Sequence, residues 1–278
     1  MKQPPIGKAV DGRDKPGHDA LCMANRPFRE IRVTSTASPP IRRAMVLAAG
    51  LGQRMRPITD TLPKPLVRIG GKAMLDHALD RLADAGIEEA VVNVHHLAGQ
   101  VEAHLAGRTR PRIVISDERG ELLETGGGAK KALPLLGDGP FFSVNSDSLW
   151  SERGISNFGA MAAAWDGETM DMLLLLAERE SSVGFNGPGD FFRDEAGRLT
   201  RRGAAASAPY VYAGVAIVTP DFFVDTPASF SFNLLFDRAI ARGRLSGHVL
   251  EGRWLHVDRP EAIAPAEVAF AAAQPVDA

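Results

Sequence analysis

Short apolar runs alternate with segments of helical spacing from Ala44 onward. The runs that have the length of buried strands cover residues 44–49, 89–94, 112–116 and 141–144. The segments with apolar residues at helical spacing cover 74–85, 100–105 and 127–136. This alternation predicts an α/β fold with a mostly parallel mixed sheet and helices on both faces, in which ligands bind at the carboxyl ends of the strands.

The second half of the chain has a less regular pattern. We expect strands at 172–177, 210–218 and 254–257. Residues 185–200 between them are rich in Gly, Asp and Phe, which predicts a hairpin or a lid over a substrate pocket.

The first 43 residues differ from the rest of the chain. Pro, Gly, Arg, Asp and Ser dominate them, and their apolar residues follow neither a helical nor a strand period. We therefore predict a disordered extension over 1–43, followed by a single domain over 44–278. Met23 and Met45 offer later translation starts, so the alternative interpretation is that this extension is absent from the native protein.

Composition narrows the class of protein. The chain has 278 residues, of which 45% are hydrophobic and 24% charged, and its net charge is −2, which argues against a general nucleic-acid binder. Its longest apolar runs fall well short of the roughly 20 residues that span a bilayer, so no membrane association is expected. The single cysteine, Cys22, excludes an internal disulfide and fits a cytoplasmic location.

The run at 44–49 ends in a turn of small residues that is typical of an anion-binding site. Ala48, Ala49, Gly50 and Gly52 leave room for phosphate oxygens to approach backbone N–H groups. The planar guanidinium of Arg54 follows, as does Lys64, which stands between Pro63 and Pro65. This predicts a nucleoside triphosphate site; the alternative is an ordinary strand-to-helix turn with solvated basic residues.

These motifs resemble the sugar-1-phosphate nucleotidyltransferases. The resemblance rests on Leu47–Met55 and Pro63–Leu66, and it continues through Glu124–Gly128, Asn145–Asp147 and Tyr212–Val215. It implies a Rossmann-like (GT-A-like) domain and a Mg²⁺-dependent transfer of a nucleotidyl group from a nucleoside triphosphate to a sugar 1-phosphate. The later segments are most similar to bacterial uridylyltransferases of peptidoglycan recycling, which implies UTP and N-acetylmuramate 1-phosphate as substrates.

Two other functions stay open at this point. One is a mannose-1-phosphate guanylyltransferase that uses GTP. The other is a catalytically weak nucleotide-sugar-binding or regulatory protein, because the segment from Trp254 to Pro260 departs from the family pattern. The sequence leaves the oligomeric state open.

The resemblance also assigns the candidate site residues. Arg54 and Lys64 are expected to be catalytic. The expected nucleotide-binding residues are Ala48, Ala49, Gly50, Gly52, Gln53, Arg54, Lys64, Gly120, Thr125 and Gly126. On the sugar side, Asp190 and Gly214 match the family's contact positions, whereas Arg201 and Arg202 either meet the incoming phosphate or form a solvated pair.

Asp147, which follows the run at 141–144, is expected to bind Mg²⁺. Its alternative role is a helix cap. The second metal ligand of the family falls at His256 by register, and Asp258 stands where the family has glycine. Because Mg²⁺ prefers oxygen ligands and residues two apart on a strand share a face, we expect Asp258 to bind the metal with His256 as its neighbour.

Overall fold

The computed structural model describes residues 40–152, 154 and 156–273. The extension predicted at 1–43 therefore lies almost entirely outside the described residues. Its last residues are described: Ile41 is buried, and Arg43 is the first residue of β1 (Arg43–Leu47).

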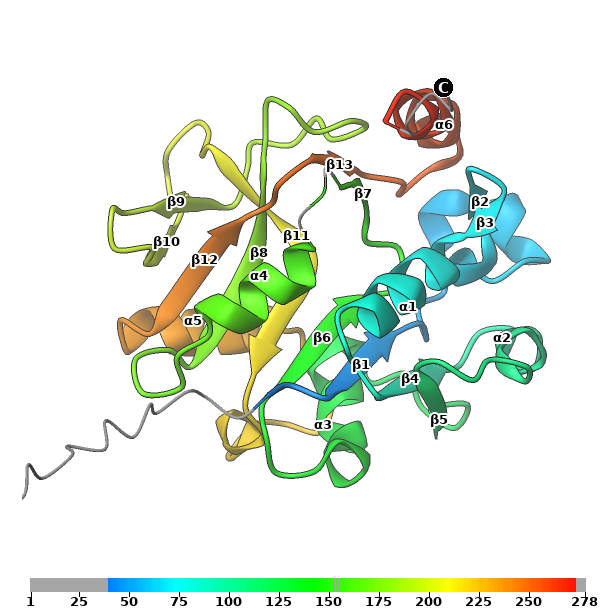
Figure 1. Ribbon diagram of the computed structural model, residues 1–278, viewed down its shortest axis with the longest axis horizontal. Helices are drawn as coiled ribbons and strands as arrows, with labels where there is room; N and C mark the ends of the chain where they lie inside the picture. Colours follow the sequence, from blue (N-terminus) through cyan, green and yellow to red (C-terminus); the bar gives the residue numbers. More distant parts are fainter. Residues whose placement is uncertain (1–39, 153, 155, 274–278) are drawn as a thin grey trace, which may run out of the picture. The chain divides into compact units, whose positions relative to one another are not determined.

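The described residues form one nine-stranded mixed sheet. Its first half is the parallel array β6-β1-β4-β5, and β11 continues it antiparallel to β6 (Figure 1). β11 also pairs with β9 of the β9–β10 hairpin and with β8. In turn, β8 pairs with β12, which runs parallel to it. The bounds are β4 (Glu89–Val94), β5 (Arg112–Asp117), β6 (Phe141–Asn145), β8 (Met172–Glu178), β9 (Phe191–Arg193), β10 (Leu199–Arg201), β11 (Tyr210–Val218) and β12 (Leu245–Val249).

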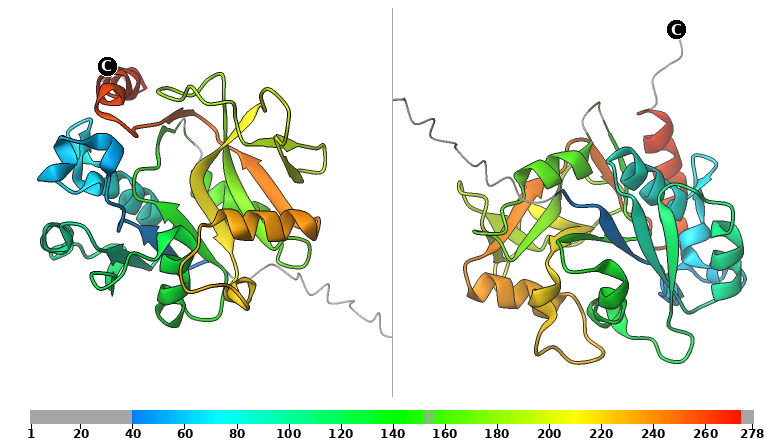
Figure 2. Two further views of the ribbon diagram at one scale, coloured as in Figure 1. Left: turned by 180° about the vertical axis from the view of Figure 1, so that it is seen from behind. Right: turned by 60° about the horizontal axis from the view of Figure 1, so that its bottom comes forward.

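Helices cover both faces of this sheet, which confirms the predicted fold class. Side chains of α1 (Met74–Asp84), α2 (Ala98–Leu105) and α4 (Asn157–Ala164) pack in the core on one face. The other face packs against α3 (Glu124–Leu136) and α5 (Asn233–Ala241); α5 lies in front of the sheet in the left view of Figure 2. Within the described part of the chain, no helix combines the length and apolar character needed to cross a membrane.

A smaller apolar cluster joins the end of the chain to the region after the glycine turn. It lies between α6 (Ile263–Ala271), the β2–β3 hairpin (Arg68–Ile69 and Lys72–Ala73) and the paired strands β7 (Leu149–Ser151) and β13 (Arg253–Leu255). Its buried members include Met55 and Val257. The segments that carry Arg54 and Asp258 are thereby packed together, although some 200 residues separate them in the sequence.

Several predicted boundaries shift. The first strand ends at Leu47, two residues before the predicted end, and the helix predicted at 127–136 begins at Glu124. The predicted hairpin or lid forms the β9–β10 hairpin. In the second half of the chain, the strands β7 and β12 and the helices α4, α5 and α6 were not predicted from the sequence. The segments of α4 and α6 are rich in alanine and apolar over most of their surface, so they lack the apolar and polar alternation from which helices are read.

The histidine buried in α1 predicts a pH-dependent stability. Burial, reinforced by the charge of Arg81, lowers the pKa of His77 below its ordinary 6.5, although its hydrogen bond to the Ile69 carbonyl opposes this. The unfolded chain then binds more protons than the folded chain just below pH 6.5, so the free energy of unfolding should fall as pH falls through that value.

Denaturant unfolding of the wild type and of His77→Gln at pH 8, 7, 6 and 5 measures this effect. Glutamine keeps an N–H donor for Ile69 but cannot take up a proton, so the slope between pH 7 and 5 should decrease in the variant. An unchanged slope would contradict the assignment to His77.

Candidate functional site

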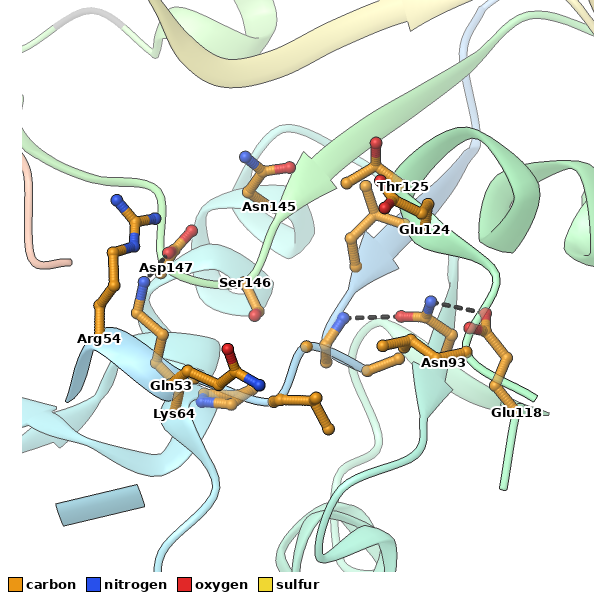
Figure 3. Close-up of a pocket in the computed structure, with 18 of the residues that line it drawn as sticks. Gln53, Arg54, Lys64, Asn93, Glu118, Glu124, Thr125, Asn145, Ser146 and Asp147 are labelled. Carbon is orange, nitrogen blue, oxygen red and sulfur yellow. Dashed lines mark hydrogen bonds and ion pairs between the residues drawn. The ribbon is translucent and has the colours of Figure 1, made fainter. Parts of the chain in front are cut away.

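A cleft of about 810 Å³ opens at the carboxyl ends of β1 and β6. The cleft is lined by the glycine-rich turn and by the cations and carboxylates that were predicted from distant parts of the sequence (Figure 3). The predicted site residues that line it are Ala48, Ala49, Gly50, Gly52, Gln53, Arg54, Lys64, Thr125, Asp147 and Asp258. Because β1, β4, β5 and β6 are parallel, their carboxyl ends share one edge of the sheet, which brings these residues together.

The turn after β1 is shaped by Gly52. Its φ is +61°, and a Cβ atom there would lie 2.9 Å from Thr59 Cγ2 and 3.2 Å from Lys64 Cβ. Glycine is therefore what allows the Lys64 segment to pack directly against the turn. Among the described residues, no carbonyl or side chain accepts a hydrogen bond from the N–H groups of Gly50 and Gly52. These amides are free to bind an anion in the cleft.

Ala48 contacts the cleft, but its N–H group is already engaged. It donates to Asn93 Oδ1 at 2.6 Å, and Asn93 Nδ2 in turn donates to Glu118 Oε1 at 2.7 Å. Glu118 is fully buried, and its Oε2 has no hydrogen-bond partner within the described chain. Asn93 and Glu118 both line the cleft, at the opposite end from Lys64 in Figure 3.

Neither Asn93 nor Glu118 is among the site residues predicted from the sequence. Asn93 interrupts the apolar run of β4, where every residue is buried. A polar residue inside a buried apolar run often indicates a functional position, so this pattern could have identified Asn93 as a site residue. Glu118 stands in a polar segment after β5 that reads as exposed loop, so its burial was not visible in the sequence.

Lys64 and Asp147 form an ion pair at the floor of the cleft. Lys64 Nζ donates to Asp147 Oδ2, and the Lys64 side chain is 15% exposed. Burial alone would raise the pKa of the Asp147 carboxyl, but the ammonium of Lys64 lowers it below the ordinary value. Asp147 is therefore ionised at neutral pH. It lies just after β6, as predicted.

Asp258 is held by two arginines. Arg54 Nη1 donates to its Oδ2 at 2.7 Å, and Arg259 Nε donates to its Oδ1 at 3.0 Å. Burial would raise the pKa of Asp258, but the hydrogen bond from Arg259 and the neighbouring positive charges lower it. The Arg54 side chain is 70% exposed, and Arg54 lines the cleft.

His256 does not line the cleft. Its ring packs against Trp254 and Phe185, with centroid separations of 4.8 and 5.6 Å, and its Nε2 is 3.5 Å from Asp258 Oδ2. Burial lowers the pKa of His256, which makes it neutral at pH 7. The prediction that His256 and Asp258 share one face of a strand was wrong, because β13 ends at Leu255 and both residues follow it. Asp258, not His256, reaches the cleft.

Asp147 and Asp258 supply the oxygen ligands with which this cleft could hold a divalent cation. The described residues contain no group of three or more His, Cys, Asp or Glu side chains placed to bind a metal by themselves. Mg²⁺, however, is usually held by one or two carboxylates together with substrate phosphates. Two ionised carboxylates that line one cleft fit this pattern.

Two glycines expected to bind the nucleotide do not line the cleft. Gly120 is exposed, and the N–H group of Gly126 donates to the carbonyl of Phe230 at 2.8 Å. A Cβ atom on Gly126 would lie 2.4 Å from the Phe230 ring. Gly126 thus allows α3 to pack closely against the segment around Phe230. The residues of the preceding segment that line the cleft are Leu122, Glu124 and Thr125.

A second cavity of about 270 Å³ adjoins the cleft and shares Thr125 and Asn145 with it. Asp190, predicted on the sugar side, lines this cavity and accepts the N–H of Tyr212 through its Oδ2 at 2.9 Å. Arg201 lines it as well. Arg202 instead donates to the carbonyls of Gly189 and Ala205, so the two arginines do not form a pair.

Gly214, predicted on the sugar side, does not line the cavity. Its φ is +81°, at an irregularity in the pairing of β11 with β8. A Cβ atom there would lie 2.0 Å from Ser148 Oγ and 3.0 Å from Asn145 Nδ2. Gly214 therefore positions the segment that carries Asn145 and Asp147, and it is not a direct contact of the cavity.

Comparison with known proteins places this architecture among enzymes that act on sugar phosphates. The chain matches the family described as nucleotidyl transferase over residues 43–185. It is 51% identical over 235 residues to N-acetylmuramate alpha-1-phosphate uridylyltransferase of Caulobacter vibrioides, covering 83% of this chain and 97% of that protein. The enzyme of the same name from Neisseria meningitidis is 35% identical over 221 residues, covering 77% and 92%. Mannose-1-phosphate guanyltransferase of Neurospora crassa is 29% identical over 226 residues, covering 79% and 61%.

Solved structures agree on the fold. The inositol-1-phosphate CTP transferase from T. maritima matches with a TM-score of 0.68 at 18% identity, covering 87% of this chain and 99% of that one. A UDP-glucose pyrophosphorylase complexed with UDP-glucose matches with a TM-score of 0.68 at 19% identity, covering 84% and 100%.

Proposed function

This chain belongs to the nucleotidyl transferase family, and from that premise we propose that it transfers a uridylyl group from UTP to N-acetylmuramate 1-phosphate and releases pyrophosphate. The observation that carries the substrate pair is the 51% identity over 83% of the chain to an uridylyltransferase of that specificity. The cleft supports the reaction type independently, because it combines a free-amide turn with two cations and two ionised carboxylates. This reaction would serve peptidoglycan recycling.

The chain's own groups account for binding and alignment of the triphosphate. The N–H groups of Gly50 and Gly52 and the guanidinium of Arg54 hold the β and γ phosphates. Lys64, at the floor of the cleft, stabilises negative charge as it develops at the α-phosphate. An oxygen of the sugar phosphate attacks the α-phosphorus in line, and the bond to pyrophosphate breaks.

The nucleophile needs no general base. The second pKa of a phosphomonoester is about 6, so the attacking oxygen is already ionised at neutral pH. Catalysis then depends on alignment of the two substrates and on neutralisation of their charge.

Asp147 and Asp258 would hold Mg²⁺ together with phosphate oxygens of the substrates. When bound, the ion supplies charge neutralisation that the cations of the chain do not provide alone. His256, buried against aromatic rings and neutral, packs beside this site without facing it.

Pyrophosphate release tests this proposal. The purified protein is incubated with Mg²⁺ and with each of UTP, GTP, CTP, ATP and dTTP against N-acetylmuramate, N-acetylglucosamine, glucose and mannose 1-phosphates. We expect release with UTP and N-acetylmuramate 1-phosphate, and loss of release when a chelator removes Mg²⁺. Release only with GTP and mannose 1-phosphate would overturn the proposed substrates, as would nucleotide binding without any turnover.

A further inference from the structure

We propose that the second cavity contains a carboxylate-binding subsite built on Arg201, which selects an acidic sugar 1-phosphate over a neutral one. The inference rests on the proposed function and assigns its sugar specificity. N-acetylmuramate differs from N-acetylglucosamine by a lactyl ether that ends in a carboxylate. A cationic side chain remote from the reacting phosphate would bind this carboxylate and so distinguish the two sugars.

The cavity has the size and place of a subsite. Its volume of about 270 Å³ is smaller than the roughly 300–1,000 Å³ of a complete ligand site, so it fits one part of a substrate. It shares Thr125 and Asn145 with the cleft, and Asn145 lies two residues before Asp147. A sugar whose phosphate lies near Asp147 can therefore extend into the cavity past Asn145.

Arg201 is the only cation in the described lining of this cavity, and it does not line the cleft. The cations that line the cleft are Arg54 and Lys64. The position of Arg201 thus favours contact with a substituent of the sugar. Contact with the reacting phosphate, one of the two roles left open by the sequence, is less favoured.

The guanidinium of Arg201 is oriented by hydrogen bonds to two side chains and by contacts with two aromatic rings. Its Nε donates to Asp237 Oδ1 at 2.8 Å, and its Nη2 donates to Asn233 Oδ1 at 3.0 Å. Its Cζ lies 5.0 Å from the ring centroid of Phe191 and 5.5 Å from that of Phe236. Nη1 has no acceptor among the described residues. An oriented guanidinium with an unused donor is well suited to bind a carboxylate.

Asp190 sets the orientation of the sugar within the cavity. It is the other charged residue of the described lining, and its Oδ2 is fixed by the N–H of Tyr212. A substrate carboxylate is repelled by Asp190 and attracted by Arg201, whereas sugar hydroxyls and an acetamido N–H can donate to Asp190. The two side chains therefore sort the acidic and the donor groups of the sugar to different ends of the cavity.

The test compares N-acetylmuramate 1-phosphate with its methyl ester, which keeps the lactyl group but lacks the charge. Steady-state pyrophosphate release is measured at saturating UTP and Mg²⁺ for the wild type, Arg201→Gln, Arg201→Lys and Arg198→Gln. We expect the wild type to prefer the acid in kcat/KM by about 10- to 100-fold. Arg201→Gln should reduce this preference to less than about threefold through a higher KM for the acid, and Arg201→Lys should retain part of it.

Arg198→Gln is the matched control. It removes a positive charge from the residue just before β10, the strand that carries Arg201. The Arg198 side chain, however, is 61% exposed and pairs with Asp194. Its preference for the acid should equal that of the wild type. Because the readout is a ratio of two substrates on one preparation, partial loss of folded protein does not change it.

The outcomes separate this inference from the proposed function. If the wild type uses N-acetylmuramate 1-phosphate but Arg201→Gln keeps the preference for the acid, the carboxylate subsite is refuted and the proposed function stands. Equal losses for the acid and the ester in Arg201→Gln would also refute it, since they would assign Arg201 to the shared phosphate or to packing. If the wild type uses only a different sugar 1-phosphate, the proposed function and this inference fail together.

Discussion

Lys64→Ala should lower kcat by about 100- to 1,000-fold, which is the typical cost of removing one preorganised group that stabilises developing charge. Lys64 is the cation at the floor of the cleft, and it is 15% exposed and paired with Asp147. Its loss removes positive charge near the α-phosphate and leaves Asp147 without the ammonium that lowers its pKa. The effect should appear in kcat, because this interaction strengthens as the transition state forms.

The same substitution should change stability far less. The Asp147 side chain is 33% exposed, so water can solvate it once Lys64 is gone, and we expect a loss of about 1–2 kcal/mol at most. The matched control is Lys72→Ala, which breaks the exposed pair of Lys72 with Asp80 outside the cleft. Steady-state kinetics and denaturant unfolding of both variants make the comparison. Near-normal turnover in Lys64→Ala would refute its assigned role.

Gly214→Ala should destabilise the fold by about 2–4 kcal/mol, since it adds overpacking to backbone strain. At φ +81° an alanine is strained, and its Cβ would lie 2.0 Å from Ser148 Oγ. Ser148 donates to the Ala213 carbonyl at 2.9 Å, so it has little freedom to move away. For a domain of this size the loss corresponds to a drop in Tm of roughly 5–15 °C.

Gly203→Ala separates the two causes. Gly203 also has a positive φ, +56°, but a Cβ atom there would meet nothing within 4 Å. Its substitution should cost about 1 kcal/mol, from backbone strain alone. Thermal unfolding of both variants measures the difference, and equal losses at the two positions would contradict the predicted clash with Ser148.

The sequence predicted the parts of the site whose constraints are local. The turn of small residues after β1, in which Gly52 has a positive φ, depends on consecutive residues. The position of Asp147 just after β6 depends on consecutive residues as well. The parallel sheet then follows from the alternation of strands and helices, and it brings these segments to one edge.

What the sequence did not reveal depends on contacts between distant segments. The burial of Glu118 is set by Asn93, 25 residues earlier in the chain, and by Gly128 in α3, where a Cβ atom would lie 2.7 Å from Glu118 Oε1. The choice between His256 and Asp258 depends on where β13 ends, and that strand is fixed by its pairing with β7. The tight contact of Gly126 with Phe230 likewise joins α3 to a segment about 100 residues later.

The pairing of each cleft cation with a carboxylate has a thermodynamic consequence. With Lys64 on Asp147 and Arg54 on Asp258, each cation that lines the cleft is already paired with a carboxylate. A bare phosphate that takes Lys64 leaves Asp147 without its counter-ion, which cancels part of the binding energy, whereas Asp258 keeps its hydrogen bond from Arg259 if Arg54 turns to the phosphate. A nucleotide that carries a divalent cation would supply Asp147 with a new counter-ion. We therefore expect the cleft to bind a nucleotide together with its cation more tightly than bare inorganic phosphate.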